Sequence, residues 1–530
     1  MRRKHLPPLV AASVLAALAP GLAAVPAHAS PGPATAAAAT PGAAPAAASA
    51  APSPVATTAL PASYTRQKLD WRRCGADTPA ALQCASFKVP LDYRRPGGRK
   101  IEIVASRLRS TDPGKRRGVM LSNPGGPGGP GITVPLRLAE VYPKSVLDRY
   151  DLIGLDPRGI GRSTPVSCGL AKDEQSLMRP LRTFDANVAW AKRVADKCRA
   201  KSGDLLPHIT TRNTARDMDV LRALLGERRI SYFGISYGTA LGAVYTQMFP
   251  QRADRFVLDS AVDPDGMWRE MFRSWGREAE PAFARWAKWT AERSATYGLG
   301  TTADEVTETF WGLVRRADRE PIVVGGAPYS GADIRDALRA EFFTPRSGAE
   351  WVVVVKKAAA GEDTEIPPMP GPTDQTVSAL WSVLCGDAAW PRDPRTYRAN
   401  SIRDAARYPL HGDFASGIGP CAFWDAPVEP VTKVDNTVKA LVVQNEWDSQ
   451  TPLKAAQSMH RAMKGSRMVT VAGGEGHGVA GLNRCADGLA ATYLATGKLP
   501  ARDVTCRVDP QTGARSPLVA DSGRPAPAAR

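Results

Sequence analysis

The sequence predicts an α/β fold in which a mostly parallel sheet has helices on both faces and carries an inserted, largely helical cap. Short apolar runs bounded by turn residues recur along the chain, and several are apolar throughout, as strands buried on both faces are. Helical patterns lie between them; the clearest, 214–225, has four apolar side chains on one face and ends at Gly226. Such alternation is typical of parallel sheets. The predicted strands are residues 101–105, 118–121, 152–155, 230–233, 256–258, 441–443 and 468–471.

The alternation of strand and helix stops between about residues 267 and 425. Tryptophans and helical stretches such as 282–296 occupy this part, and strands resume at residue 441. We interpret the stretch as a cap inserted into the sheet domain, since α/β enzymes often fill such a length with a core and a cap. The predicted layout is a core in two parts, 63–266 and 426–510, a cap at 267–425 and a flexible tail at 511–530.

The first residues predict export. A basic start at residues 2–4 precedes an apolar stretch, 9–22, and Ala-His-Ala at 27–29 supplies a cleavage pattern, so residues 1–29 match a secretory signal peptide. The apolar stretch is shorter than the roughly 20 residues that a membrane-spanning helix needs, and no later segment qualifies. Residues 30–62 are an Ala/Pro-rich leader or pro-segment that cannot build a core. We therefore expect a secreted, extracellular protein without stable membrane insertion.

Composition and charge fit a globular protein rather than a nucleic-acid-binding one. Of 530 residues, 43% are hydrophobic and 23% charged, which allows a large core and excludes disordered and collagen-like chains. The formal net charge is +17, but the basic residues are scattered and mostly arginine, with no Lys/Arg run or reader motif. We expect no nucleic-acid partner. Nothing in the sequence predicts the oligomeric state.

The cysteines agree with export. There are eight, all after the predicted signal peptide, and an even number in a secreted chain predicts disulfides. Their clustering into successive pairs favours bonds between neighbours, although many connectivities are possible. No C-x-x-C or H-x-x-x-H spacing occurs, so we expect no metal site, and we expect no cofactor. The favoured pairs are Cys74 with Cys84, Cys168 with Cys198, Cys385 with Cys421 and Cys485 with Cys506.

Gly-Ile-Ser-Tyr-Gly at 234–238 has the context of a nucleophile elbow. It follows the predicted strand 230–233 and leads into a helical run, 239–249. A sharp turn from strand to helix needs glycines beside the serine, because side chains there would collide with neighbouring backbone, and it leaves the serine Oγ exposed. Ser236 is therefore the predicted nucleophile.

A serine hydroxyl needs a base. Of six histidines, two belong to the predicted signal peptide, two precede the strands after which this topology places its base, and one lies in a helical run. His477 remains, in the glycine-rich loop 473–478 after the strand predicted to end at Val471. We predict His477 as the base.

The chain order serine, acid, histidine predicts an acid between Ser236 and His477. Asp448 follows the predicted strand 441–443 and stands 477 − 448 = 29 residues before the histidine. Its carboxylate would fix the imidazole tautomer and stabilise the imidazolium. Glu446, one strand pleat earlier, and Asp259, after the preceding strand, are the alternatives.

A glycine-rich loop at 122–131 follows the predicted strand 118–121 and would let backbone N–H groups reach a developing oxyanion, together with the N–H of Tyr237. The loop also matches G-x-G-x-x-G, the pattern of dinucleotide sites. Pro127 and Pro130, which lie inside this pattern, remove N–H donors that a pyrophosphate would need, and an exported protein has little access to NAD. We therefore reject a dinucleotide site.

Four features together resemble the secreted bacterial tripeptidyl aminopeptidases of the α/β-hydrolase fold. They are N-P-G-G-P-G at 123–128, G-L-D-P-R-G-I-G-R-S at 154–163, G-I-S-Y-G-T at 234–239, and the pair Asp448 and His477. The resemblance spans roughly residues 69–506. It implies a serine exopeptidase that releases tripeptides from the free N-termini of peptides.

Prolyl iminopeptidases are related, and their corresponding loop has the sequence His-Gly-Gly-Pro-Gly. Alignment with residues 124–128 makes Gly126 the oxyanion donor beside Tyr237 and places a proline where the relatives have histidine. This replacement of histidine by proline does not affect the predicted role of the loop, because the oxyanion donor is a backbone N–H group.

The residue that binds the substrate amine is not identified by the sequence. A cap carboxylate is the natural device, and Asp387, Glu350, Glu341 and the cluster 362–365 are all candidates. Two other functions use the same fold: a secreted carboxylesterase or lipase with the same triad, and a non-catalytic binding protein. The second is disfavoured because all three triad members are present.

Overall fold

The computed structural model describes residues 60–342, 344–364, 372–509 and 516–518, all within one unit, residues 58–530. The predicted signal peptide, most of the predicted leader and most of the predicted tail lie outside the described residues. Ser516 and Leu518 are exceptions in the tail: Ser516 Oγ donates to the Ala480 carbonyl at 2.6 Å, and Leu518 is buried among core side chains. This short piece of the predicted flexible tail is fixed to the core.

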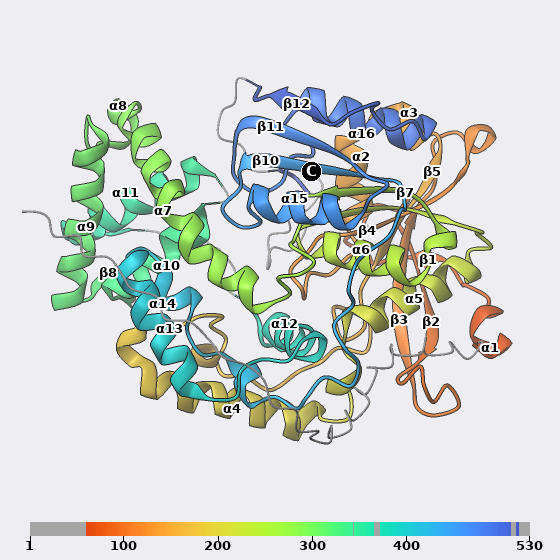
Figure 1. Cartoon of the computed structure of the whole chain (residues 1–530), viewed down its shortest axis with the longest axis horizontal. Helices are drawn as coiled ribbons and strands as arrows, with labels where there is room; N and C mark the ends of the chain where they lie inside the picture. Colours follow the sequence, from red (N-terminus) through yellow and green to blue (C-terminus); the bar gives the residue numbers. More distant parts are fainter. Residues whose placement is uncertain (1–59, 343, 365–371, 510–515, 519–530) are drawn as a thin grey trace, which may run out of the picture. The chain divides into compact units, whose positions relative to one another are not determined.

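A ten-stranded sheet forms the centre of the fold (Figure 1). Its strand order is β1-β2-β3-β5-β4-β6-β7-β10-β11-β12. The pairings β1·β2, β2·β3 and β3·β5 are antiparallel and the other six are parallel, which confirms the predicted α/β fold. The strands are β1 (Arg72–Arg73), β2 (Gln83–Pro90), β3 (Lys100–Leu108), β4 (Gly118–Asn123), β5 (Tyr150–Leu155), β6 (Ile230–Ile235), β7 (Ala253–Asp259), β10 (Ala440–Trp447), β11 (Arg467–Glu475) and β12 (Val504–Arg507).

Helices cover both faces of this sheet (Figure 1). Strand side chains alternate between the faces: in β4, Val119 and Leu121 pack into one hydrophobic cluster and Met120 into another. The first cluster includes apolar side chains of α5, α6 and α15, and the second those of α2 and α16. The helices outside the insertion are α1 (Ala62–Thr65), α2 (Val134–Val141), α3 (Lys144–Leu147), α4 (Phe184–Ser202), α5 (Thr211–Leu224), α6 (Tyr237–Met248), α15 (Leu453–Ala462) and α16 (Arg484–Thr496).

Between β7 and β10 the chain forms a helical insertion, in the stretch where the sequence predicts a cap. The helix predicted at 282–296 begins much earlier, because α7 spans Arg269–Ala291, and a separate short helix follows it. The described elements are α7, α8 (Ser294–Tyr297), α9 (Ala303–Arg319), β8 (Ile322–Val324), β9 (Ala327–Tyr329), α10 (Gly331–Glu341), α11 (Pro345–Ala359), α12 (Asp374–Asp387), α13 (Pro394–Arg407) and α14 (Gly412–Ala415).

The insertion has two parts with different packing. Buried side chains of α7, α9, α10 and α11, such as Phe283 and Phe310, form a hydrophobic cluster of their own. The helix α12 instead packs Val377, Trp381 and Leu384 into the main cluster of the sheet domain. By its packing, α12 therefore belongs with the sheet domain, although its sequence lies within the insertion.

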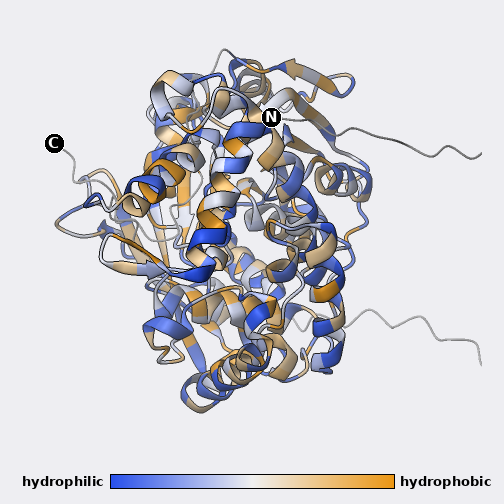
Figure 2. Ribbon diagram, turned by 90° about the vertical axis from the view of Figure 1, so that its left-hand side faces the viewer, coloured by the Kyte–Doolittle hydropathy of each residue, from blue (hydrophilic) through white to orange (hydrophobic). Residues whose placement is uncertain are grey.

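The insertion helices form because their apolar residues recur at helical spacing. In α9, Val306, Phe310, Leu313, Val314 and Ala317 are buried, and the Thr302 side chain caps the N-terminus by accepting the Glu305 N–H. The same change between hydrophilic and hydrophobic residues is visible along the helices in Figure 2. No helix among the described residues is long and apolar enough to cross a membrane.

All eight cysteines lie in the described residues and form four disulfides, in the neighbour-to-neighbour pairing that their clustering favours. The pairs are Cys74–Cys84, Cys168–Cys198, Cys385–Cys421 and Cys485–Cys506. Each bond joins residues close in sequence, so each fixes local structure; Cys385–Cys421 ties the end of α12 to the segment Pro420–Phe423.

Candidate active site

Ser236 stands at the sharp turn between β6 and α6. Its backbone has φ 58° and ψ −126°, a left-handed conformation that costs a non-glycine residue about 1–3 kcal/mol and is found mostly where function demands it. The turn is held because Ser236 N–H donates to the Asp259 carbonyl at 3.0 Å and Thr239 Oγ1 donates to the Ser236 carbonyl at 2.6 Å. A Cβ on Gly238 would lie 2.7 Å from the Asn123 carbonyl oxygen, so a glycine is required there. The side chain of Ser236 stays partly exposed.

His477 and Asp448 form a buried pair at the ends of neighbouring strands. His477 Nδ1 lies 2.8 Å from Asp448 Oδ2, and the two residues are 4% and 2% exposed. The other carboxylate oxygen accepts the backbone N–H groups of Gln450 and Thr451 at 2.8 and 3.0 Å, and Thr451 Oγ1 donates to Oδ2 at 2.9 Å. Because this carboxylate accepts on all sides, Nδ1 carries the proton and Nε2 is left as the basic nitrogen.

Two side chains, one on β10 and one directly after the neighbouring strand β7, fix the loop that carries His477. Asn445 Nδ2 donates to the carbonyls of Gly476 and Gly478, at 3.0 and 3.1 Å, on either side of the histidine. The Gly478 N–H donates in turn to Ser260 Oγ at 2.9 Å. The imidazole is therefore held through the backbone as well as through Asp448.

The two alternative acids hold backbone instead of the imidazole. Asp259 accepts the N–H groups of Val479 and Ala480 at 2.8–3.1 Å, and burial raises its pKa to about 6, against the lowering effect of these hydrogen bonds. Glu446 accepts the Gly473 N–H at 2.7 Å. The predicted acid, Asp448, contacts the ring of His477, whereas no such contact is described for the two alternatives.

The loop after β4 lies against Ser236. A Cβ on Gly125 would come within 3.0 Å of Ser236 Cβ and 3.6 Å of Ser236 Oγ, so the loop can approach the serine only as glycine. The Gly125 N–H is taken by Asn123 Oδ1 at 3.0 Å. By contrast, the N–H groups of Gly126 and Tyr237, the two predicted oxyanion donors, have no acceptor among the residues that the structure describes.

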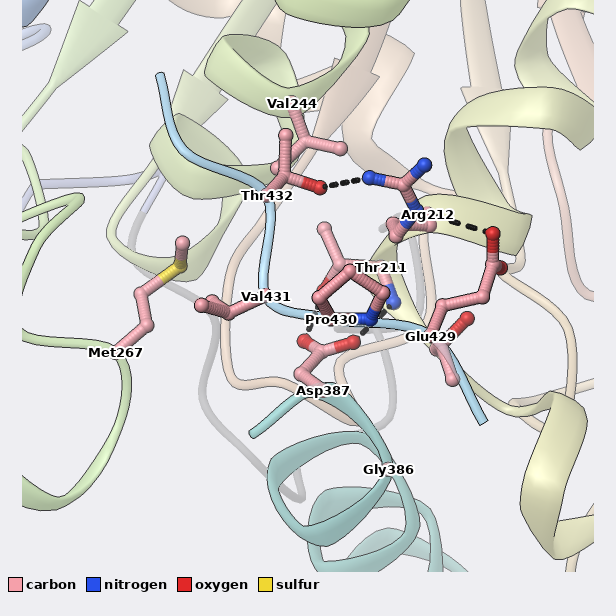
Figure 3. A pocket seen from close by; sticks show the side chains of 11 residues that line it. Thr211, Arg212, Val244, Met267, Gly386, Asp387, Glu429, Pro430, Val431 and Thr432 are labelled. Atoms are coloured by element: carbon pink, nitrogen blue, oxygen red, sulfur yellow. Dashed lines mark hydrogen bonds and ion pairs between the residues drawn. The ribbon is translucent and has the colours of Figure 1, made fainter. Parts of the chain in front are cut away.

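The candidate amine anchors differ in environment. Asp387 is buried at the end of α12 and accepts Thr211 N–H and Thr211 Oγ1 at 2.7 and 2.5 Å (Figure 3). It also accepts Trp268 Nε1 at 3.2 Å. The cavity beside it measures about 10 Å³, roughly one water molecule and too small for a peptide N-terminus. Glu350 and Glu362 are exposed and Glu341 is buried at the end of α10, while Glu365 lies outside the described residues.

Two contacts between the insertion and the catalytic loops have no signal in the sequence, because they depend on how distant segments pack. Trp275 Nε1 on α7 donates to the Gln450 carbonyl at 2.7 Å, two residues after Asp448. Arg285, also on α7, forms an ion pair with Glu475 at 2.5 Å, two residues before His477. Burial raises the pKa of Glu475, and Arg285 opposes this.

The arrangement offers a partly exposed serine hydroxyl, a histidine oriented by a carboxylate and backbone N–H groups without an acceptor among the described residues, which together suit acyl transfer through a covalent serine intermediate. Among the described residues no group of three or more His, Cys, Asp or Glu side chains could hold a metal ion.

Comparisons with known proteins agree with this chemistry. Residues 118–305 match the family model of the alpha/beta hydrolase fold, and residues 408–506 match that of TAP-like proteins. The tripeptidyl aminopeptidase of Streptomyces lividans is 35% identical over 479 residues, which cover 84% of this chain and 88% of that protein. Serine protease Hip1 of Mycobacterium tuberculosis is 28% identical over 83% of this chain and 91% of its own length. Carboxylesterase B of the same species is 30% identical over 82% and 89%. The chain is a serine hydrolase and belongs to the tripeptidyl aminopeptidase family of α/β hydrolases.

Proposed function

We propose that this protein is a secreted exopeptidase that releases tripeptides from the free N-termini of peptides, with Ser236 as nucleophile, His477 as base and Asp448 as the acid that orients it. The observation that carries the proposal is the buried 2.8 Å pair of His477 and Asp448 in a chain whose partly exposed Ser236 occupies a strained elbow. Export is supported by the leader sequence and by the four disulfides.

In the proposed reaction, His477 Nε2 takes the hydroxyl proton as Ser236 Oγ bonds to the scissile carbonyl carbon. The carbonyl electron pair moves to oxygen, where the N–H groups of Gly126 and Tyr237 hold the negative charge. Collapse breaks the C–N bond, and the imidazolium, stabilised by Asp448, gives its proton to the leaving amine. Water activated by His477 then hydrolyses the ester on Ser236 and frees the tripeptide.

A carboxylesterase is the second candidate, and the 30% identical relative named Carboxylesterase B favours it. The two candidates differ in what they require of the acyl group. An aminopeptidase must recognise a free ammonium at a fixed distance from the scissile bond, whereas an esterase pocket for an apolar acyl chain has no such demand.

The test is kcat/KM for a tripeptide anilide with its amine free and with its amine acetylated, beside mono- and dipeptide anilides and a p-nitrophenyl ester. Leaving a buried carboxylate without its cation costs about 3–5 kcal/mol, so acetylation should lower kcat/KM by roughly two to three orders of magnitude. Equal values for the two tripeptides would discard the exopeptidase and leave a general serine esterase.

A further inference from the structure

Asp387 is a buried carboxylate that the proposed reaction does not use; the charge of Arg212 acts on it from a distance, but among the described residues it forms no direct ion pair. Among the described residues no Lys, Arg or His side chain lies within ion-pair distance of it; its hydrogen-bond donors are the backbone and hydroxyl of Thr211 and the indole of Trp268. Burial raises its pKa to about 6, against the lowering effect of these donors, so the group is ionised near neutral pH. Burying an ionised carboxylate costs free energy, and the cavity beside Asp387 is too small for substrate. We therefore expect a role of Asp387 in holding other parts of the protein.

The hydrogen bonds around Asp387 lead to the nucleophile elbow. Thr211 Oγ1 lies 2.5 Å from Asp387 Oδ2 and 2.9 Å from the hydroxyl of Tyr237, the residue directly after Ser236. An ionised carboxylate only accepts, so the Thr211 hydroxyl donates to Asp387 and the Tyr237 hydroxyl donates to Thr211. The carboxylate thereby determines which hydroxyl donates and which accepts in each of these hydrogen bonds.

Trp268 closes the cluster from the other side. Its indole N–H donates to the same Asp387 oxygen at 3.2 Å, and its ring packs on the ring of Tyr237 with 5.6 Å between centroids. The four side chains come from the end of α12, the start of α5, the start of α6 and the segment before α7, and all are at least nine-tenths buried. Tyr237 is therefore held both by its hydroxyl and by its ring.

The same helix also touches the other half of the predicted oxyanion hole. A Cβ on Gly128, two residues after Gly126, would lie 2.9 Å from the Thr376 carbonyl of α12. One helix of the insertion thus packs against the loop that carries Gly126 and, through Asp387, holds the residue that carries the second donor.

We propose that Asp387 is a positioning residue for the oxyanion hole: acting through Thr211, it fixes Tyr237 so that its N–H points at the developing charge beside Ser236. The proposal rests on the proposed acyl transfer at Ser236, but not on the length of the peptide released, because every acyl transfer at this serine needs the same two donors.

The test uses the full-length enzyme. Three substitutions each remove a different member of this series of hydrogen bonds: Asp387→Asn, Thr211→Val and Tyr237→Phe. Thr211→Ser keeps the hydroxyl and should restore activity. Asp374→Asn is the matched control, since Asp374 lies at the other end of α12 and accepts the Ser167 hydroxyl and the Leu170 N–H, away from the elbow. For each variant, turnover of a p-nitrophenyl ester is measured. The affinity for a tripeptide aldehyde is measured as well, because its adduct with Ser236 places an oxyanion in the hole. The corresponding alcohol, which forms no adduct, serves as the reference ligand.

Loss of a whole oxyanion donor costs about 10²–10³ in kcat, so a displaced donor should cost ~10–100-fold. We expect kcat and aldehyde affinity to fall together by this factor in the three variants, while KM and alcohol affinity stay within about twofold of the parent. Thr211→Ser and Asp374→Asn should have values close to those of the parent. Tyr237→Phe leaves the Thr211–Asp387 bonds in place and serves if the other two do not fold. Unchanged kcat and aldehyde affinity in folded variants would overturn the proposal, and so would equal losses of affinity for aldehyde and alcohol. Activity of the parent enzyme on the ester would in either case still support its assignment as a serine hydrolase.

Discussion

Asp448, Glu446 and Asp259 show how the role of a carboxylate depends on its hydrogen bonds. All three follow or end neighbouring strands, and all three satisfy the chain order that the sequence alone provides. Asp448 contacts the ring of His477, whereas Glu446 accepts one backbone N–H and Asp259 accepts those of the loop beyond the histidine. The sequence could place an acid in this region, but the choice depended on which strand end faces the imidazole.

We predict that Asp448→Asn lowers kcat by about 10⁴, because an amide in place of the carboxylate favours the wrong tautomer of His477. The matched control is Glu446→Gln, which changes a carboxylate two residues away that does not contact the ring, and it should stay within a fewfold of the parent. Both are measured as kcat on one tripeptide anilide, with folding checked by circular dichroism. Equal losses in the two variants would contradict the assignment of Asp448.

At the scale of elements, the helix α7 of the insertion reaches the catalytic loops twice, through Trp275 and through Arg285. The guanidinium of Arg339, on α10, lies 4.2 Å above the Trp275 ring, so two insertion helices converge on the loop that follows Asp448. The insertion therefore supports the geometry of the loop that follows Asp448.

Trp275→Phe should lower kcat by about tenfold, because the Gln450 carbonyl loses its indole donor while the ring still supports Arg339. Trp286→Phe is the control on the same helix, since the Trp286 N–H is buried without a partner among the described residues. It should change the melting temperature and leave kcat unchanged. If both variants keep the parent kcat, the contact between α7 and the acid loop has no role in catalysis.

Asp404 joins three insertion helices: α13 carries it, and it accepts from Arg273 on α7 at 3.3 Å, from Arg403, and from Ser416 just after α14. Burial opposes ionisation, but these hydrogen bonds prevail and hold the pKa at about 2, below the ordinary value near 3.9. A lowered pKa stabilises the folded state above the ordinary pKa, and this stabilisation is lost as pH falls through the folded value.

Asp404→Asn should therefore reduce the free energy of unfolding by about 1–2 kcal/mol at pH above about 5. The difference between parent and variant should shrink as pH falls from about 4 towards 2, where Asp404 becomes protonated. Urea unfolding across this range measures it. A difference that does not change with pH would show that the ionised form of Asp404 contributes nothing.

For the whole molecule, local sequence patterns predicted the central elements better than the edges and the contacts. Each predicted strand coincides with an observed strand, because each contains a short apolar run bounded by turn residues. Strand β2, which lies between the two-residue edge strand β1 and β3, was not predicted, since its exposed and buried residues alternate. The opposite edge strand β12 was not predicted either, because it is short and has a single buried residue. The elbow and the histidine loop could be predicted because each is a local motif. The bonds of Asp387 to Thr211 and of Trp275 to Gln450 join residues more than a hundred positions apart, which no local pattern encodes.

The proposed export, the proposed release of tripeptides and the serine chemistry describe one molecule: a disulfide-bonded hydrolase whose helical insertion contacts the loops that carry Asp448 and His477. The most direct measurement of this account is mass spectrometry of the products released from a long peptide with a free N-terminus. We predict successive tripeptides removed from that end, no product from the N-acetylated peptide, and no product with either peptide when Ser236→Ala is used. Single residues, dipeptides or internal fragments would contradict the release of tripeptides, and turnover by Ser236→Ala would contradict the nucleophile.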